Sequence, residues 1–325
     1  MAKIDIYVHG RGRGHATRCL AIAERLQADG HDLRGFAGAD ASEIVARAMP
    51  TTSVDSLPPR FNAHAPLRLL RRVAQVWSSM RLERPDLVVS DGDLPSLLGA
   101  RTRGVPSVAV GHGLVFAGCE CPAHLPAAVW NREARKARAS SLTASRRIAV
   151  GFVPMRVRAT GTVLARATVP VRRHAKADRV VAYFRDGIDV LTLAALRRIA
   201  PAADVFGPDE RAESIAVDRA RFLTSLERAR AVIATAGSQL IAECVAWGIP
   251  LLAVYDEGDD EQRLNAAMVQ SAGFGIGLAR HRVDATAMRA FLEHFHVAAP
   301  SSWDAPDASE AVARACDELL RGGWT

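Results

Sequence analysis

The sequence predicts an α/β protein of two doubly wound parallel-sheet domains that face each other across a cleft. Three observations support this: strand and helix patterns alternate, the alternation occurs in two separate runs, and a segment of weak periodicity lies between them. A chain of 325 residues is long enough for two domains of ordinary size. Parallel sheets of this kind bind ligands at the carboxyl ends of their strands, so we expect a site in the cleft.

The first run occupies residues 1–160. It begins with a strand over Ile4, Ile6 and Val8, and from Thr17 apolar residues recur at helical spacing up to Gly30. Three further stretches read as buried strands that end in turns: DLVVSDGD (86–93), SVAVGHG (107–113) and RRIAVGF (146–152). We predict that this run forms the N-terminal domain.

An interdomain linker is predicted over residues 161–178, which are rich in charge and interrupted by Gly161 and Pro170. The second run, residues 179–305, contains the strand patterns RVVAYFRDG (179–187) and AVIATAG (231–237), and a helix that begins at Ser238. Residues 306–325 predict a last helix, a candidate to pack back on the N-terminal domain.

Composition sets the broad class. Hydrophobic residues make up 49% and charged residues 24%, as in soluble globular proteins, and aromatic residues only 6%. So few aromatic side chains argue against a surface that stacks nucleic-acid bases. The start lacks the pattern of a signal peptide, no apolar run is long enough to span a membrane, and the five cysteines are odd in number. We therefore expect a reduced, cytoplasmic protein without a nucleic-acid partner.

The basic charge of +7 is unevenly distributed. Arginines crowd three stretches: residues 67–72, 132–138 and 156–179. Such patches can meet anionic lipid head groups, which leaves open a peripheral position at the inner face of the membrane. Solvated arginine-rich faces are the competing interpretation.

The loop after the first strand, in VHGRGRGHATRCLAIAERL (8–26), raises the possibility of a dinucleotide site. Such a site needs glycine at its first, third and sixth positions, and counted from Gly10 the sixth position is His15. The pattern therefore disfavours NAD binding. An imidazole accepts protons near neutral pH, so His15 is a candidate base, with a structural cap as the alternative.

The second half carries the more informative motif. Gly237 lies at a helix start, where free N–H groups and the helix dipole suit a phosphate, and Glu243 is a candidate acceptor for ribose hydroxyls. Glu261, Gln262 and Asn265 follow the next strand. Trp247 is expected in the core.

Three stretches of the sequence resemble segments of a known protein superfamily. TAGSQLIAECVAWGIPLLAVYDEGDDEQRLNAA (235–267) resembles the donor-binding segment of GT-B-fold nucleotide-sugar glycosyltransferases, the superfamily of the UDP-glycosyltransferases and the peptidoglycan GlcNAc-transferase. GRGRGHATRCLAIAERLQADGHDL (10–33) and PDLVVSDGDLPSLLGARTRGVPSVAVGHG (85–113) resemble the N-terminal domain of the same superfamily. The resemblance implies two Rossmann-like domains and a metal-independent, inverting transfer without a cofactor, from a nucleotide sugar that is UDP-linked.

The resemblance also implies roles for individual residues. His15 would be the general base and Asp91 the carboxylate that orients it, although Asp91 could equally be a helix cap. The implied residues on the donor side are Arg185, Gly237, Ser238, Gln239, Glu243, Glu261, Gln262 and Asn265, and those on the acceptor side or its loop are Gly12, Gly14, Arg18 and His112. Arg185 could instead be a solvated turn residue. The chain departs from the family pattern at Thr235, where histidine is usual, and at Leu240, where serine or threonine is usual.

Several alternatives remain open. GRGHATRCLAIAERL (12–26) also resembles nucleotide-sugar hydrolases of nonulosonic acid pathways, in which His15 would serve water. Thr235 and Leu240 keep open a non-catalytic binding or scaffold protein. The acceptor is unidentified, with lipid-linked molecules and small metabolites as the two classes. His112, Cys119, Cys121 and His124 form a tight cluster, but the Cys-x-Cys spacing disfavours a zinc site, so no metal is expected.

Overall fold

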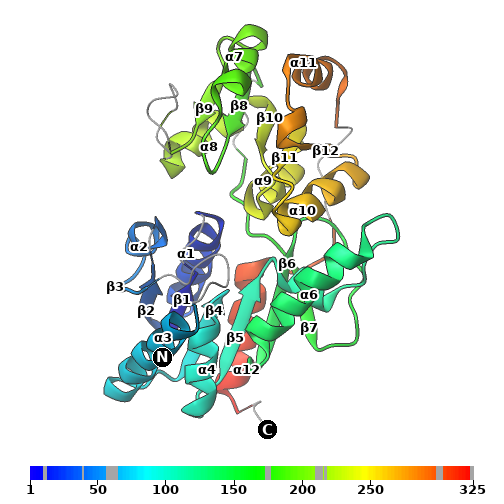
Figure 1. The fold of residues 1–325 in the computed structure, drawn as a ribbon. Helices are drawn as coiled ribbons and strands as arrows, with labels where there is room; N and C mark the ends of the chain where they lie inside the picture. Colours follow the sequence, from blue (N-terminus) through cyan, green and yellow to red (C-terminus); the bar gives the residue numbers. More distant parts are fainter. Residues whose placement is uncertain are drawn as a thin grey trace.

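The computed structural model describes residues 1–9, 13–38, 40–55, 65–172, 177–208, 215, 218–297 and 303–322. Within these residues the chain forms a seven-stranded and a five-stranded sheet, and every strand pair in both is parallel. The two sheets lie in separate lobes (Figure 1). The predicted α/β class with two parallel-sheet domains is thereby confirmed.

The strands of the first sheet, in spatial order, are β3 (Thr51–Ser53), β2 (Asp32–Ala37), β1 (Lys3–Val8), β4 (Leu87–Asp91), β5 (Ser107–Gly111), β6 (Arg146–Gly151) and β7 (Thr162–Arg166). Its helices are α1 (Arg13–Ala28), α2 (Asp40–Val45), α3 (Ala65–Leu82), α4 (Leu94–Thr102), α5 (Leu114–Gly118), α6 (Ala127–Ser141) and α12 (Ala308–Leu320).

The strands of the second sheet are β12 (Gly275–Ala279), β11 (Leu251–Tyr255), β10 (Ala229–Thr235), β8 (Arg179–Tyr183) and β9 (Asp204–Phe206). Its helices are α7 (Val190–Ile199), α8 (Arg219–Glu227), α9 (Ser238–Trp247), α10 (Asp260–Ser271), the 3₁₀ turn η2 (Arg280–Arg282) and α11 (Ala285–His294).

Each sheet has a point where its strand order reverses. In the first sheet β1 and β4 are neighbours, and Val8 pairs with Asp91 at their carboxyl ends. In the second sheet β8 and β10 are neighbours. Strands at such a point send their connections to opposite faces of the sheet, which opens a crevice at the carboxyl edge. The fold thus places His9, Asp91, Arg185 and Gly237 just where each sheet offers a ligand crevice.

The predicted linker is wrong at its start. Thr162–Arg166 forms β7, which pairs with β6 and extends the first sheet by one strand. β7 is an edge strand whose buried residues, Thr162 and Ala165, do not alternate along one face, and Val163 is exposed. Its sequence therefore shows no continuous apolar run, which is why periodicity did not reveal it.

The last helix returns to the N-terminal domain, where it packs against α1 (Figure 1). Its buried face consists of small and apolar residues such as Ala308, Val312 and Cys316, at the spacing expected for an amphipathic helix. The chain therefore crosses between the two domains twice. The first crossing follows β7, and the second precedes α12.

Candidate active site

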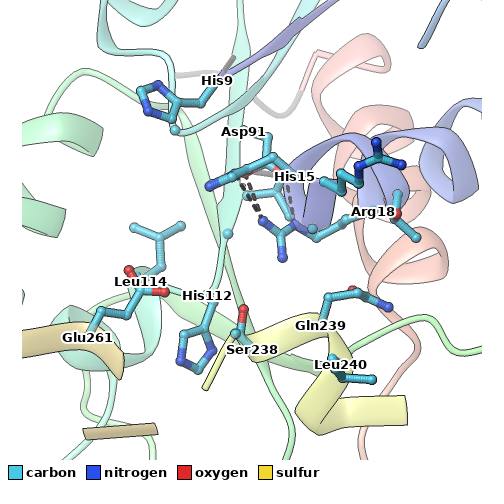
Figure 2. Close-up of a pocket in the computed structure, with 18 of the residues that line it drawn as sticks. His9, His15, Arg18, Asp91, His112, Leu114, Ser238, Gln239, Leu240 and Glu261 are labelled. Carbon is cyan, nitrogen blue, oxygen red and sulfur yellow. Dashed lines mark hydrogen bonds and ion pairs between the residues drawn. The ribbon is translucent and has the colours of Figure 1, made fainter. Parts of the chain in front are cut away.

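A cavity of about 740 Å³ lies between the two domains. Its walls include the carboxyl ends of β4, β5, β8 and β10 and residues of α1, α4, α6, α8, α9 and α10. Figure 2 shows His15, Arg18 and Asp91 on one side, with Ser238, Gln239 and Leu240 of α9 on the other. The structure thus brings the two motifs of the sequence, more than two hundred residues apart, to a single cavity.

His15, Asp91 and Arg18 form a hydrogen-bonded group. The Nδ1 atom of His15 lies 2.7 Å from Oδ1 of Asp91. Arg18 donates from Nε to Oδ2 of Asp91 at 2.8 Å and from Nη2 to Oδ1 at 2.9 Å. Because His15 and Arg18 lie three residues apart on α1, both side chains reach the same carboxylate from one face of the helix.

The charge of Asp91 is fixed by these neighbours. Its carboxylate is fully buried, and burial by itself raises the pKa of a carboxyl group. The Arg18 guanidinium and His15 outweigh burial and hold the pKa of Asp91 well below its usual range. An anion at Asp91 favours a hydrogen on Nδ1 of His15, and Nε2 then carries the lone pair. One third of the His15 side chain is exposed.

The start of the first helix differs from the prediction. α1 begins at Arg13, four residues before Thr17, so His15 lies in its first turn rather than at the tip of a loop. Arg13, Gly14 and His15 of this turn line the cavity and are not apolar, so they left no periodic signal. A Cβ atom on Gly14 would lie 3.4 Å from the Cβ of Gln239, which shows how closely α1 approaches α9. Gly12 lies outside the described residues.

The N-terminus of α9 forms the opposite wall. Gly237 is its N-cap and provides no side-chain cap, so the first backbone N–H groups of the helix are not capped by that residue. Ser238, Gln239 and Leu240 all line the cavity. Thr235 also lines it, and its hydroxyl accepts a hydrogen bond from the backbone N–H of Arg185 at 3.3 Å.

Glu243 does not present a free carboxylate in this structure. Its Oε1 accepts a 2.6 Å bond from Nη2 of Arg219 and a 3.2 Å bond from Nε2 of Gln239, and the side chain is only 1% exposed. Its Oε2 is buried without a hydrogen-bond partner among the described residues. A ribose hydroxyl could reach this carboxylate only if Arg219 moved. Sequence reasoning missed Arg219, because the pair joins two helices and follows no local motif.

Three further donor-side candidates line the cavity. Gln262 is held by Asp259, whose Oδ2 accepts from its Nε2 at 2.8 Å, and Glu261 lies beside it on α10. Arg185 is half-exposed and pairs with Asp186 at 3.0 Å, while Asp259 lies 3.8 Å away. Arg185 therefore has two carboxylate neighbours.

Asn265 is not part of the cavity wall. It is fully buried, and its Oδ1 lies 2.7 Å from Nε2 of His112. His112 does line the cavity. Trp247 is buried and donates from its indole nitrogen to the carbonyl of Pro170 at 3.0 Å, consistent with a place in the core.

Additional residues of the N-terminal domain line the cavity. His9 contacts His15 edge-on, with ring centres 5.5 Å apart, and Leu114 contributes an apolar surface. On α6, Glu133 accepts a 2.6 Å bond from Lys136, and burial raises the pKa of Glu133. No sequence motif pointed to Leu114, Glu133 or Lys136.

Among the residues that the structure describes, no group of three or more His, Cys, Asp or Glu side chains is arranged to hold a metal ion. His112 and Cys119 of the candidate cluster are buried, and His112 is engaged with Asn265. In the described part of the chain, no helix is long and apolar enough to cross a membrane.

Comparison with known protein families gives two matches, one that begins in the N-terminal domain and ends with β8 and one within the C-terminal domain. A family described as "Glycosyltransferase Family 4" matches residues 12–183, which is more than half of the chain. A family described as "Glycosyl transferase family 1" matches residues 209–296. The chain belongs to the glycosyltransferases of the GT-B fold. The family resemblance seen in the sequence is thereby confirmed.

Individual relatives of this glycosyltransferase are distant. An Azoarcus sp. protein named UDP-N-acetylglucosamine--N-acetylmuramyl-(pentapeptide) pyrophosphoryl-undecaprenol N-acetylglucosamine transferase is 28% identical, with 99% of both chains covered. Two matches to an "Uncharacterized glycosyltransferase" of Methanosarcina acetivorans are 29% and 22% identical. The first covers 34% of this chain and about a third of the relative (32%), and the second covers 84% of each.

Solved structures share the fold of this glycosyltransferase at low identity. MurG of Acinetobacter baumannii superposes with a TM-score of 0.66 at 16% identity, over 98% of this chain and 100% of that chain. The glycosyltransferase SsfS6 of Streptomyces sp. SF2575, complexed with thymidine diphosphate, gives 0.64 at 17% identity over the same shares.

Proposed function

We propose that this glycosyltransferase moves a sugar from a nucleotide sugar to a hydroxyl group of an acceptor, with inversion at the anomeric carbon and with His15 as general base. The observation that carries the proposal is the 2.7 Å contact between His15 and Asp91, in a cavity whose opposite wall is the N-terminus of α9. A base and an anion-binding helix end thus face the same space.

The chemistry follows from the charges. With Nδ1 of His15 donating to Asp91, Nε2 takes the proton of the acceptor hydroxyl as the hydroxyl oxygen attacks the anomeric carbon. The bond from that carbon to the diphosphate breaks, and its electron pair leaves with the diphosphate. The anionic Asp91 stabilises the imidazolium that forms, because opposite charges attract strongly in a buried environment. Attack from the face opposite the leaving group inverts the configuration.

The leaving diphosphate needs compensation for its charge. We assign this to the first N–H groups of α9, contributed by Ser238, Gln239 and Leu240, and to the positive end of the helix dipole. Arg185 can add a positive charge by exchanging its pairing with Asp186 for the diphosphate. The mechanism uses no metal ion and no cofactor.

The donor is proposed to be a nucleoside diphosphate sugar, with UDP as the first choice. One relative carries UDP-N-acetylglucosamine in its name, and one structural neighbour is complexed with thymidine diphosphate. Glu261 and Gln262 lie on the donor wall, where they can contact the transferred sugar. Glu243 can take a ribose hydroxyl only after Arg219 releases it.

Calorimetry with UDP, dTDP and their sugar conjugates tests the donor assignment. Binding of a nucleoside diphosphate supports it, and no binding across the series favours the scaffold alternative. The nucleotide sugar that binds in this series is then incubated with the protein, with and without cell extracts that supply acceptors. Sugar transfer that depends on the extract supports a transferase, whereas release of free sugar at an equal rate in both reactions indicates the hydrolase alternative.

We propose further that the N-terminal domain contacts an anionic membrane surface through α3, which fits a lipid-linked acceptor. Leu67, Leu70 and Trp77 are exposed on one side of this helix. Arg68, Arg71 and Arg81 are exposed as well, and α3 contains no acidic residue. Apolar side chains flanked by arginines are typical of helices that lie on anionic bilayers.

Part of the charge of the second arginine-rich stretch is paired. In the second stretch, Arg132 is paired with Asp260 and Lys136 with Glu133. Co-sedimentation with vesicles that contain phosphatidylglycerol tests the role of α3. The exchange Leu70→Glu should abolish binding at low salt, and Leu191→Glu, at an exposed leucine of α7 in the other domain, should leave it unchanged. Equal binding of the wild type to neutral and anionic vesicles would contradict the assignment.

A further inference from the structure

His112, which lines the cavity, meets Asn265, which lies behind the cavity wall, across the boundary between the two domains. His112 follows β5 of the N-terminal domain, and Asn265 lies on α10 of the C-terminal domain. The distance from Nε2 of His112 to Oδ1 of Asn265 is 2.7 Å, and the two residues are only 4% and 0% exposed. Water therefore does not screen this contact.

The contact is the middle of a longer series of close polar contacts. On one side, Nδ1 of His112 lies 2.9 Å from the carbonyl oxygen of Val150, at the end of β6. On the other, Nδ2 of Asn265 donates to the carbonyl oxygen of Ala236 at 3.0 Å. Ala236 immediately precedes Gly237, the N-cap of α9. A continuous path thus runs from the first sheet to the turn that begins the donor-side helix.

The His112 ring has little freedom to move. Phe152 stacks on it with ring centres 5.3 Å apart, and Phe116 packs against it edge-on at 5.4 Å. The preceding residue, Gly111, packs beside Asp91: a Cβ atom there would lie 3.4 Å from Oδ1 of Asp91. The segment that carries His112 therefore lies beside the carboxylate that orients the base.

We propose that His112 and Asn265 are positioning residues that fix the distance between His15 and the N-terminus of α9. This inference rests on the proposed function, in which those two features act on the acceptor and the diphosphate. Neither residue needs to touch a substrate. They hold the domain that carries His15 and the turn before α9 at a fixed distance. The attacking hydroxyl and the leaving diphosphate are then aligned on opposite sides of the anomeric carbon.

The expected effect is mainly on kcat. A misplacement of about 1 Å costs on the order of 10²-fold in rate, so Asn265→Ala and His112→Ala should each lower kcat by about that factor. The Kd of the nucleoside diphosphate should change little, because neither side chain belongs to the donor contacts. The two residues act on one path, so the double variant should be no slower than either single variant.

The chain offers a matched control. Arg132 on α6 and Asp260 on α10 join the same two domains through a bidentate pair at 2.8 and 2.9 Å, but Arg132 is about half exposed. Exposed ion pairs contribute little. Arg132→Ala should therefore keep wild-type kcat within about twofold.

Kinetics and nucleotide calorimetry on the four variants and the wild type test the proposal. It is overturned by wild-type kcat in Asn265→Ala, by losses that add in the double variant, or by an equal loss in Arg132→Ala. Hydrogen exchange of the ligand-free proteins gives an independent readout. Asn265→Ala should speed exchange in residues 234–240 and in residues 111–116, and Arg132→Ala should not.

Failure of the proposed function has a different signature. If the wild type binds no nucleoside diphosphate, the proposed function fails, and the exchange experiment still decides whether the two segments are linked. Unchanged exchange in Asn265→Ala overturns the inference on its own.

Discussion

Replacing Asp91 with asparagine removes one charge from a buried ion pair at the cavity wall. Asp91 is fully buried and Arg18 is 4% exposed, so the variant leaves an uncompensated guanidinium away from water. Breaking a buried pair in this way costs about 3–5 kcal/mol of unfolding free energy. Domains of this size are stable by about 5–15 kcal/mol, so Asp91→Asn should still fold at 25 °C.

The effect on turnover has a separate cause. An asparagine side chain keeps a hydrogen bond to His15 but carries no charge to stabilise the imidazolium. The kcat should fall on the order of 10²–10⁴-fold, the usual contribution of a general base.

The double variant Asp91→Asn with Arg18→Met separates the two effects. It removes both charges, so stability should recover by several kcal/mol in urea unfolding, while kcat stays low. The reasoning is refuted if Asp91→Asn lowers the unfolding free energy by less than about 1 kcal/mol, because an unpaired buried charge costs more than that. It is also refuted if the double variant regains wild-type turnover.

Three further predictions concern stability. Burial raises the pKa of Asp5 to about 6 in spite of its pairing with Arg34, so the folded state binds more protons than the unfolded state between pH 4 and 6. The unfolding free energy of the wild type, measured by urea titration and compared with that of Asp5→Asn, should therefore fall by about 2 kcal/mol as the pH rises from 4 to 6. Gly99→Ala would place a Cβ atom 2.5 Å from a methyl group of Val76 and should lower the unfolding free energy by about 1–3 kcal/mol. Gly113→Ala is the control: no atom lies within 4 Å of the added Cβ, so the unfolding free energy should fall by less than about 1 kcal/mol. Gly248 ends α9 in the left-handed conformation, at a φ of 64°, which strains any residue with a Cβ atom. Gly248→Ala should therefore lower the unfolding free energy by about 1–2 kcal/mol in thermal or urea unfolding. An unchanged unfolding free energy would contradict the left-handed cap.

The fold was predictable where local chemistry and packing agree. Gly237 and Gly248 flank α9, and the helix occupies the residues between them, with its start at Ser238 as expected. The strand pattern around Asp91 also corresponds to a buried strand, because parallel strands covered on both faces read as apolar runs. The start of α1 and the edge strand β7 escaped prediction because their polar residues follow no buried pattern.

The site was predictable only in part. His15, Asp91 and Ser238 lie at strand or helix ends, where topology collects ligand-binding residues, and all three line the cavity. Gln262 and Asn265 share one motif, but they lie three positions apart on α10, and only Gln262 reaches the cavity. The pairing of Glu243 with Arg219 depends on how α8 packs against α9, and no spacing in the sequence encodes that contact.

The most direct test of the account is turnover of His15→Ala beside its nucleotide affinity. With the nucleotide sugar that the wild type binds, release of the nucleoside diphosphate should slow by about 10²–10⁴-fold, and the Kd of that diphosphate should stay close to the wild-type value. Wild-type turnover in His15→Ala would contradict the assignment of the base.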